Sequence, residues 1–310
     1  MPALFFSITL LLSIHSLFFS SCSSIDAQGQ ALLTWKTTLT SSTNPLKSWV
    51  SSDQTPCNWV GIHCNSNGDV IKISLKSVDL QGSLPSNLQP LKFLNTLILS
   101  STNLSGPIPK QFGDYNQLVV MDISDNFLSG AIPVEICKLV RLQSLSLNMN
   151  YFEGEIPYEI GNLSSLVYFT LYDNKLNGEF PRSIGNLRNL EILRAGGNEN
   201  LKGELPWEIG NCSNLIIIQT IAIYTAMLTG PIPEEIGNCT ELQKLYLYQN
   251  SISGSIPGRI VELRKLQSLL LWQNAIVGSI PYELGSLKEL AVLDLSDNLL
   301  TGTIPTMLTG

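Results

Sequence analysis

The stretch ELQKLYLYQNSISGSIP, Glu241–Pro257, contains the pattern from which most of the chain is built. Its apolar residues alternate only around Leu245 and Leu247, which suits one short β-strand. Asn250 follows where the chain must turn, and Gly254 with the proline three residues later marks the far side of that turn. A single copy is too short to bury its own apolar residues, so copies must stack to form a core.

The Gly-x-x-Pro part of this pattern recurs at one period along the chain. It begins at Gly82, Gly106, Gly130, Gly154, Gly178, Gly203, Gly230, Gly254, Gly278 and Gly302. The intervals are 24 residues, except for 25 before Gly203 and 27 before Gly230. This periodicity predicts a leucine-rich-repeat solenoid, an α/β-type superhelix with short parallel strands on its concave face.

One asparagine of most repeats falls in the same column of the aligned copies. These asparagines are Asn126, Asn150, Asn174, Asn250, Asn274 and Asn298. We expect them to be buried and to hydrogen-bond the turning backbone of adjacent coils, because a buried amide without partners is costly. The other side chains of each strand must then project from the concave face.

Residues 1–24 precede the repeats and have a different composition. The run Leu4–Phe19 is mostly apolar and contains no acid, lysine or arginine, and small residues follow up to Ser24. This predicts a cleavable secretory signal peptide with cleavage near residues 22–27. The alternative is a membrane anchor, for which the apolar run is short.

Residues 25–66 are predicted to form an N-terminal cap on the solenoid. Ala-Leu-Leu-x-Trp ending at Trp35 and Leu46-x-x-Trp49 suggest short amphipathic helices that cover the first coil. Cys57 and Cys64 close a small loop and predict a disulfide in a secreted chain. Residues 67–310 then form the repeat array of about ten coils, irregular over residues 190–230 and ending inside an eleventh coil without a C-terminal cap.

Composition and spacing argue against several classes of function. The net charge is −7 and no run of lysine or arginine is present, which gives no support for a nucleic-acid partner. The only histidines are His15 and His63, and the cysteines lack metal-ligand spacing, so we expect no metal and no cofactor. The chain also has no phosphate-binding loop and no kinase catalytic motif, so it is not predicted to be an enzyme.

Four cysteines lie outside the predicted disulfide. Cys22 belongs to or adjoins the signal segment, and we expect Cys137, Cys212 and Cys239 to be buried free thiols because they occupy repeat positions.

Several short motifs resemble those of plant leucine-rich-repeat receptor kinases. Ala-Leu-Leu-x-Trp, Ser-Trp and Cys-x-Trp-x-Gly-x-x-Cys resemble their N-terminal cap, and the Leu-x-Gly-x-Ile-Pro repeats resemble the plant-specific repeat subtype. The resemblance covers essentially the whole chain. It implies the ectodomain of a membrane serine/threonine kinase at the plasma membrane, truncated before its transmembrane and kinase regions. It also implies two partners, a secreted peptide hormone on the concave face and a co-receptor kinase ectodomain.

One irregular coil contains the strongest candidate binding site. Arg194 lies between the core positions Leu193 and Ala195, so it must project from the concave face. Gly196 and Gly197 follow, and we expect a hollow beside the guanidinium that suits a carboxylate, phosphate or sulfate. The alternative is an ordinary exposed arginine beside two turn glycines. Arg-x-Gly-Gly resembles the signature of the root meristem growth factor receptors, which implies recognition of a tyrosine sulfate on the peptide.

Aromatic residues occupy neighbouring columns of the predicted concave face. They are Tyr172, Tyr224, Tyr246, Tyr248 and Trp272. Exposed aromatic side chains are favoured at protein contacts, so we predict that they contact the peptide. The alternative is that they stack on one another along the ladder of strands.

The interval between Gly203 and Gly230 departs from the period. Leu215 and Ile218 compete for one core position, and Ala226 replaces the column asparagine. We expect a local bulge and weaker stacking of the coils there.

Four N-glycosylation sequons occur in the chain. They lie at Asn103, Asn162, Asn211 and Asn238, and we expect glycans wherever these asparagines face solvent, most clearly at Asn103.

A second class of function is a secreted leucine-rich-repeat inhibitor of microbial pectin-degrading enzymes. Such plant proteins resemble this chain in length and repeat type. They end in a cysteine-containing cap that is missing here, and the Arg-x-Gly-Gly motif has no role in them.

Overall fold

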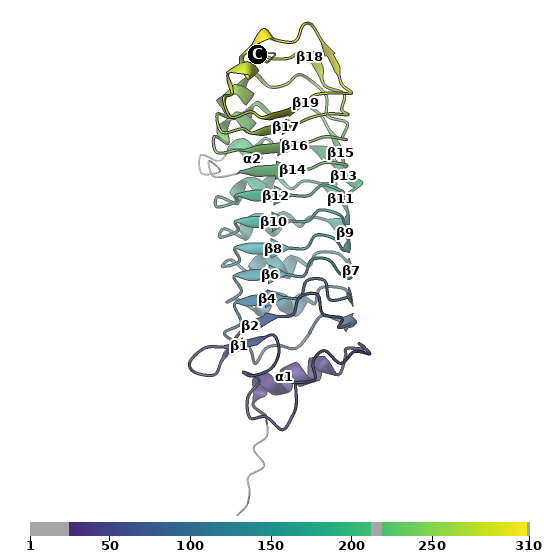
Figure 1. Cartoon of the computed structure of the whole chain (residues 1–310), viewed down its shortest axis with the longest axis vertical. Coiled ribbons are helices and arrows are strands. Elements are labelled where there is room, and N and C mark those ends of the chain that lie inside the picture. Colours follow the sequence, from purple (N-terminus) through teal and green to yellow (C-terminus); the bar gives the residue numbers. More distant parts are fainter. Residues whose placement is uncertain (1–24, 212–218, 309–310) are drawn as a thin grey trace, which may run out of the picture.

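The computed structural model describes residues 25–211 and 219–308, which stack coil upon coil into an elongated solenoid (Figure 1). The predicted leucine-rich-repeat architecture is confirmed. The predicted signal peptide at residues 1–24, the thiol of Cys212 and the expected bulge at Leu215–Ile218 lie outside the described residues.

The main sheet runs along the length of the solenoid and has eleven strands. In spatial order they are β1 (Ile62–Cys64), β2 (Val70–Ser74), β4 (Thr96–Ile98), β6 (Val120–Asp122), β8 (Ser144–Ser146), β10 (Tyr168–Thr170), β12 (Ile192–Arg194), β14 (Thr220–Ala222), β16 (Lys244–Tyr246), β17 (Ser268–Leu270) and β19 (Val292–Asp294). Only the first pair, β1 with β2, is antiparallel. In the parallel three-residue strands of this sheet the middle residue points into the core, as Phe169 does in β10, and in most of them its neighbours are less buried.

A second ladder of strands follows the turn in each coil, and it was not predicted. It comprises β3 (Gly82–Ser83), β5 (Leu104–Gly106), β7 (Phe127–Gly130), β9 (Tyr151–Glu155), β11 (Lys175–Glu179), β13 (Asn200–Glu204) and β15 (Met227–Thr229), with β18 (Val277–Ser279) and β20 (Leu299–Thr301) as a separate pair. Leu176 is fully buried while Lys175 and Asn177 are exposed. The Asn-x-Leu-x-Gly segment therefore alternates as a strand does, although its small and polar residues hide the pattern in the sequence.

Short helical turns form the side of each coil opposite the main sheet. They are the 3-10 helices η1 (Lys110–Asp114), η2 (Val134–Lys138), η3 (Tyr158–Asn162), η4 (Arg182–Asn186), η6 (Glu234–Asn238), η7 (Gly258–Glu262), η8 (Tyr282–Ser286) and η9 (Thr306–Leu308), and the α-helical turn α2 (Glu208–Asn211). The proline of the repeat precedes each turn, because its fixed φ is compatible with a helical start and no amide donor is needed there.

The hydrogen bonds predicted for the asparagine column are confirmed, although Asn250, Asn274 and Asn298 are half-buried rather than buried. Asn150 shows the pattern: its Oδ1 accepts from the amide of Leu128 at 3.0 Å, and its Nδ2 donates to the carbonyls of Ile123 at 3.0 Å and Leu147 at 3.2 Å. Leu128 and Ile123 belong to the preceding coil, so each asparagine joins two coils. Asn198, which the sequence analysis missed, makes the same contacts and is fully buried.

The column is interrupted at Ala226, as its replacement of asparagine predicts. In the regular coils an asparagine carbonyl accepts the amide two residues after the preceding asparagine, as Asn198 does for Leu176 at 3.1 Å. The coil of Asn198 has one extra residue, so the corresponding amide is that of Leu201, three residues after Asn198, and it donates to the backbone oxygen of Asn198 at 3.0 Å. The coil that contains Asn198 therefore lacks this side-chain tie to its successor.

The N-terminal cap is organised around the helix α1 (Ala27–Lys36) and three tryptophans. Asp26 caps the helix by accepting from the amide of Gly29 at 2.7 Å. Trp49 lies between Trp35 and Trp59, with ring centroids 5.9 Å and 5.5 Å away. These rings cover the end of the core, which a solenoid would otherwise expose.

The second helix expected in the cap, at Leu46–Trp49, is wrong. The chain makes a turn at residues 45–48, closed by a hydrogen bond from the amide of Trp49 to the carbonyl of Leu46 at 3.0 Å. Serine, threonine and aspartate surround this segment, and their side chains compete with the backbone for hydrogen bonds, so the turn does not extend into a helix.

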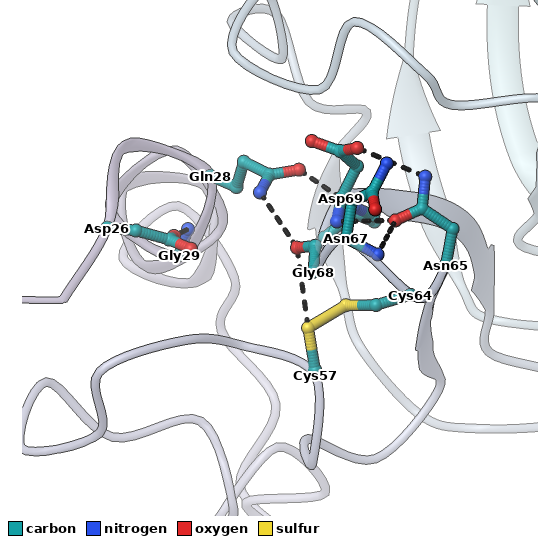
Figure 2. The surroundings of a disulfide bond; sticks show 10 residues. Asp26, Gln28, Gly29, Cys57, Cys64, Asn65, Asn67, Gly68 and Asp69 are labelled. Atoms are coloured by element: carbon teal, nitrogen blue, oxygen red, sulfur yellow. Dashed lines mark hydrogen bonds between the residues drawn. A yellow bond between two sulfur atoms is a disulfide. The ribbon is translucent and has the colours of Figure 1, made fainter.

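The predicted disulfide between Cys57 and Cys64 is confirmed (Figure 2). Gln28 of α1 ties the cap to the first parallel strand beside this bond. Its Nε2 donates to the carbonyl of Gly68 at 3.2 Å, and its Oε1 accepts from the amide of Val70 at 2.7 Å. The disulfide and Gln28 together fasten the cap to β2.

Cys137 and Cys239 are both buried in the core, as predicted. The thiol of Cys239 lies 3.6 Å from the carbonyl oxygen of Ile209. Burial raises the pKa of the Cys137 thiol to about 12, and the nearby carboxylates of Glu159 and Glu135 act in the same direction.

Candidate functional site

The outward side chains of the main sheet form a continuous surface that we call the sheet face. Parallel pairing places Arg194, at the end of β12, between Thr170 of β10 and Ala222 of β14. Both neighbours are small, so the guanidinium is exposed. It makes no hydrogen bond or ion pair with any residue in the described part of the chain. The prediction that Arg194 projects from this face is confirmed.

The hollow expected over Gly196 is filled, so that expectation is wrong. Gly196 is buried, and a Cβ atom built on it would lie 2.7 Å from three ring carbons of Tyr224. The Tyr224 ring therefore rests flat on the glycine backbone. The missing side chain makes room for an aromatic ring of the next coil, not for a ligand.

Gly197 is covered by an acid that the sequence analysis overlooked. Its φ is +68°, and an added Cβ would clash with a carboxylate oxygen of Asp173 on the preceding coil. The Gly197 amide already donates to the carbonyl of Tyr224 at 2.8 Å. Burial raises the pKa of Asp173. The Gly197 amide is thus not free for an anion.

Three of the predicted aromatic residues stack on one another along the ladder. The ring centroids of Tyr224 and Tyr248 are 4.7 Å apart, and those of Tyr248 and Trp272 are 4.8 Å apart, with the planes within 9° of parallel. This spacing equals the roughly 4.8 Å between neighbouring strands. Stacking, the alternative weighed for these residues, is what the structure shows. All three residues are half-buried.

The other two aromatic residues lie outside this stack. Tyr246 ends β16 in the same row as Arg194, one strand beyond Ala222. Tyr172 follows β10, on the coil before Gly196. The five predicted aromatic residues therefore lie on one face, where three form a stack and two, Tyr172 and Tyr246, stand apart from it.

Charges around the stack act on its hydroxyl groups. Burial raises the pKa of the Tyr224 phenol, Asp173 and Tyr172 add to the rise, and Arg194 opposes it. Burial also raises the pKa of Tyr248. Both phenols stay protonated at neutral pH and can donate hydrogen bonds to a ligand.

A line of polar side chains runs beside the stack. The hydroxyl of Thr225 donates to Gln249 Oε1 at 2.9 Å, and Gln249 Nε2 donates to Gln273 Oε1 at 3.2 Å. All three residues have positive φ, near 50°, as does the equivalent position of most coils. The sheet face thus presents an aromatic row and a polar row in parallel.

Comparison with known proteins places this geometry in a family. Residues 25–65 match the leucine rich repeat N-terminal domain, and leucine rich repeats match at 117–139, 141–163, 165–187, 241–263 and 289–310. The LRR receptor-like serine/threonine-protein kinase RGI3 of Arabidopsis thaliana is 58% identical over 101 residues, which are 32% of this chain and 9% of that protein. The BIR2 ectodomain from Arabidopsis thaliana is 33% identical, with a TM-score of 0.52, over 57% of this chain and 95% of that one. The chain belongs to the leucine-rich-repeat family of plant receptor-kinase ectodomains.

Two solved peptide complexes resemble this leucine-rich-repeat ectodomain more closely in sequence or in shape. The plant peptide hormone receptor RGFR1, in complex with RGF2, is 59% identical with a TM-score of 0.70, covering 81% of this chain and 43% of that one. GASSHO1/SCHENGEN3 from Arabidopsis thaliana, in complex with CASPARIAN STRIP INTEGRITY FACTOR 2, is 34% identical with a TM-score of 0.86, covering 91% and 34%. The ectodomain thus spans less than half of either chain.

The sequons of this leucine-rich-repeat ectodomain differ in availability. Asn103 and Asn162 are exposed, although Asn103 donates to Asp79 at 2.9 Å. Asn238 is held at both ends, because its Nδ2 donates to Gly210 at 2.6 Å and its Oδ1 accepts from Arg259 at 2.7 Å. The side chain of Asn211 lies outside the described part. Glycosylation stays a prediction, and Asn162 has the least constrained side chain.

Residues 25–211 and 219–308 contain no group of three or more histidine, cysteine, aspartate or glutamate side chains that could hold a metal ion. No helix in this part of the ectodomain is long and apolar enough to cross a membrane.

Proposed function

We propose that this chain is the extracellular ligand-binding region of a plant receptor kinase and that it recognises a secreted peptide along the sheet face. In this proposal Arg194 binds an anionic group of the peptide, the sulfate of a sulfated tyrosine. The similarity to RGI3 and to RGFR1 in complex with RGF2 supports the class of receptor. The resemblance of Arg-x-Gly-Gly to the root meristem growth factor receptors supports the sulfate.

The exposed, unpaired guanidinium of Arg194 is the observation that carries this proposal. Some exposed charges of this chain pair with a neighbour one coil away, as Lys265 does with Glu241 at 2.5 Å. Arg194 has no such partner in the described part of the chain, and its planar fork suits a sulfate or carboxylate. It also lies near the middle of the main sheet, where an extended ligand would pass.

The filled hollow supports one position for the anion in this proposal. Asp173 covers Gly197, and its carboxylate would repel a sulfate placed over the glycine amides. The sulfate therefore lies over the guanidinium of Arg194. In this proposal Tyr172 and Tyr224, on the coils before and after Arg194, supply the flanking phenols.

The size of the sheet face matches a short peptide. Eleven strands about 4.8 Å apart give a face roughly 48 Å long. An extended chain advances about 3.3 Å per residue, so about a dozen residues can lie along it with both ends inside the face. A co-receptor kinase ectodomain would then bind the receptor and the peptide together, as the resemblance implies.

Calorimetry on a double cycle tests the sulfate assignment. The wild type and Arg194→Ala are titrated with one synthetic peptide in sulfated and unsulfated form, for which RGF2 is the first choice. A charge-assisted pair contributes about 1.5–3 kcal/mol, so Arg194→Ala should weaken the sulfated peptide by roughly ten- to a hundredfold and the unsulfated one much less. Arg194→Lys should restore only part, because a point charge lacks the fork.

Arg188→Ala is the matched control, because Arg188 is exposed and lies off the sheet face, after η4. It should leave both affinities unchanged. Equal losses of the two peptides in Arg194→Ala would show that Arg194 does not bind the sulfate. Absence of binding by either peptide to the wild type would remove RGF2 as the ligand.

A further inference from the structure

The aromatic stack is displaced toward the N-terminal coils, and within residues 25–211 and 219–308 no second ring stacks on Trp272 at its other end. Tyr224 lies over Gly196 of the preceding coil, Tyr248 stacks on Tyr224, and Trp272 stacks on Tyr248. The second face of Trp272 is therefore turned toward β19. The residue in its column on that coil is Ser296, which is too small to cover an indole.

Two carboxylates, those of Asp294 and Asp297, belong to the coil toward which this ring face is turned. The amides of Leu271 and Gln273 donate to the carbonyls of Asp294 and Ser296, both at 2.9 Å, so Trp272 lies directly opposite the Asp294–Ser296 segment. The Asp294 carboxylate accepts from the Ser296 amide at 3.0 Å and hydroxyl at 2.6 Å. These bonds lower the pKa of Asp294 and keep it ionised. Asp297 follows and is exposed.

The same carboxylate arrangement occurs elsewhere on the sheet face without a ring. Asp122 accepts from the amide of Ser124 at 3.2 Å and from its hydroxyl at 2.6 Å. The residue opposite that segment on the preceding coil is Ser100, placed there by the hydrogen bonds of its neighbours. The two sites thus differ chiefly in the presence of Trp272.

We propose that Trp272, Asp294 and Asp297 form a subsite for one cationic side chain of the bound peptide, an arginine or a lysine. A cation over an indole face is attracted by the ring quadrupole, and carboxylates at its edge supply charge-assisted hydrogen bonds. Arginine suits the site best, because its plane can stack on the indole while its fork reaches a carboxylate. This inference rests on the proposed peptide-binding function and adds a second, oppositely charged anchor.

The strand order fixes the distance between the two anchors. Arg194 belongs to β12, and the subsite lies between β17 and β19, three to four strands further along the sheet. At about 4.8 Å per strand this is roughly 14–19 Å, or about five residues of extended peptide. The intervening row of Ala222, Tyr246 and Leu270 contains no aspartate, glutamate, lysine or arginine. The ligand therefore has an acidic group and a basic residue about five positions apart.

A first experiment tests the subsite without any peptide ligand. The ectodomain is labelled with 5-fluorotryptophan, the Trp272 resonance is assigned with Trp272→Phe, and N-acetyl-arginine N′-methylamide is titrated while fluorine spectra are recorded. The Trp272 resonance should shift and saturate, and Asp294→Asn should weaken the binding about three- to tenfold. Asp122→Asn should change nothing. Absence of a shift, or equal effects of the two variants, would overturn the proposal.

A second experiment tests the spacing on the proposed ligand. Synthetic twelve-residue peptides hold one sulfotyrosine at a fixed position, and a single arginine is moved from two to nine residues away. Affinity should peak near a separation of five, and Asp294→Asn should flatten the peak. Sulfate-dependent binding with no preferred arginine position would overturn the subsite and leave the proposed function standing. A preferred arginine position that is also found with the unsulfated peptide would support the subsite and would count against binding of the sulfate by Arg194.

Discussion

The contact between Tyr224 and Gly196 makes a specific prediction for Gly196→Ala. The φ of Gly196 is not positive, so alanine can adopt the backbone conformation without strain. Its methyl group, however, would lie 2.7 Å from three ring carbons of Tyr224, where an ordinary contact is about 3.5–4.0 Å. The ring must therefore move outward by roughly 1 Å, and the stack on Tyr248 and Trp272 must move with it or open.

The expected cost follows from two opposing effects. Overpacking of this kind costs about 1–3 kcal/mol. Replacing glycine by alanine also restricts the unfolded chain, which returns about 0.4–1 kcal/mol. We expect Gly196→Ala to destabilise the ectodomain by about 1–2 kcal/mol. In a Tyr224→Ala background the ring is absent, so the same substitution should be neutral or slightly stabilising.

Urea unfolding of the four proteins in this cycle measures the coupling, and near-ultraviolet circular dichroism reports the geometry of the stack. Gly258→Ala is the matched control, because an added Cβ there meets nothing within 4 Å and its φ is not positive. It should show only the effect on the unfolded chain, a stabilisation of about 0.4–1 kcal/mol. If the costs of Gly196→Ala and Tyr224→Ala simply add, the two residues do not touch and the filled hollow is wrong.

Three further predictions concern the scaffold. Asn150→Ala should destabilise by about 2–4 kcal/mol in urea, because it leaves a buried amide and carbonyl of the preceding coil unpaired, whereas Asn162→Ala should cost less than about 0.5 kcal/mol. Replacing Cys57 and Cys64 by serine should cost about 2–3 kcal/mol and raise hydrogen exchange first in α1, whereas a uniform rise would contradict a local tie. The raised pKa of Cys137 predicts that its contribution to the free energy of unfolding is complete below pH 9, where the unfolded thiol is also protonated. The wild type should then lose stability toward pH 12 more steeply than Cys137→Ala does. Parallel pH profiles of the two proteins would contradict this.

Much of the scaffold could be predicted because it depends on contacts at a fixed spacing. The Gly-x-x-Pro period determines which residues lie one coil apart, and the asparagine column follows from it with the donors and acceptors of a single side chain. Asn198 was missed because the glycines before it and the changed interval after it obscure the column. The second ladder was missed because its buried residues are separated by glycine and polar residues.

The candidate site was predicted in its composition but not in its packing. The outward direction of Arg194 follows from the alternation of the strand, and the sequence contains that information. The filling of the Gly196 space depends on Tyr224, which lies across the interval of irregular length, and on the direction in which its ring leans. Neither rotamers nor register across an irregular coil can be obtained from periodicity. The same applies to Asp173, whose position over Gly197 depends on its rotamer.

The gap in the asparagine column at Ala226 sets a limit on how unfolding can spread. Wherever the column is intact, a coil that unfolds removes a side-chain hydrogen-bond donor and acceptor from the preceding coil, so unfolding propagates from coil to coil. The coil of Asn198 has no such asparagine link to the coil that follows, so propagation stops there. Mechanical or thermal unravelling from the C-terminal side would therefore halt at that boundary, with Arg194 on the part that stays folded and the rings stacked over Gly196 on the part that is lost.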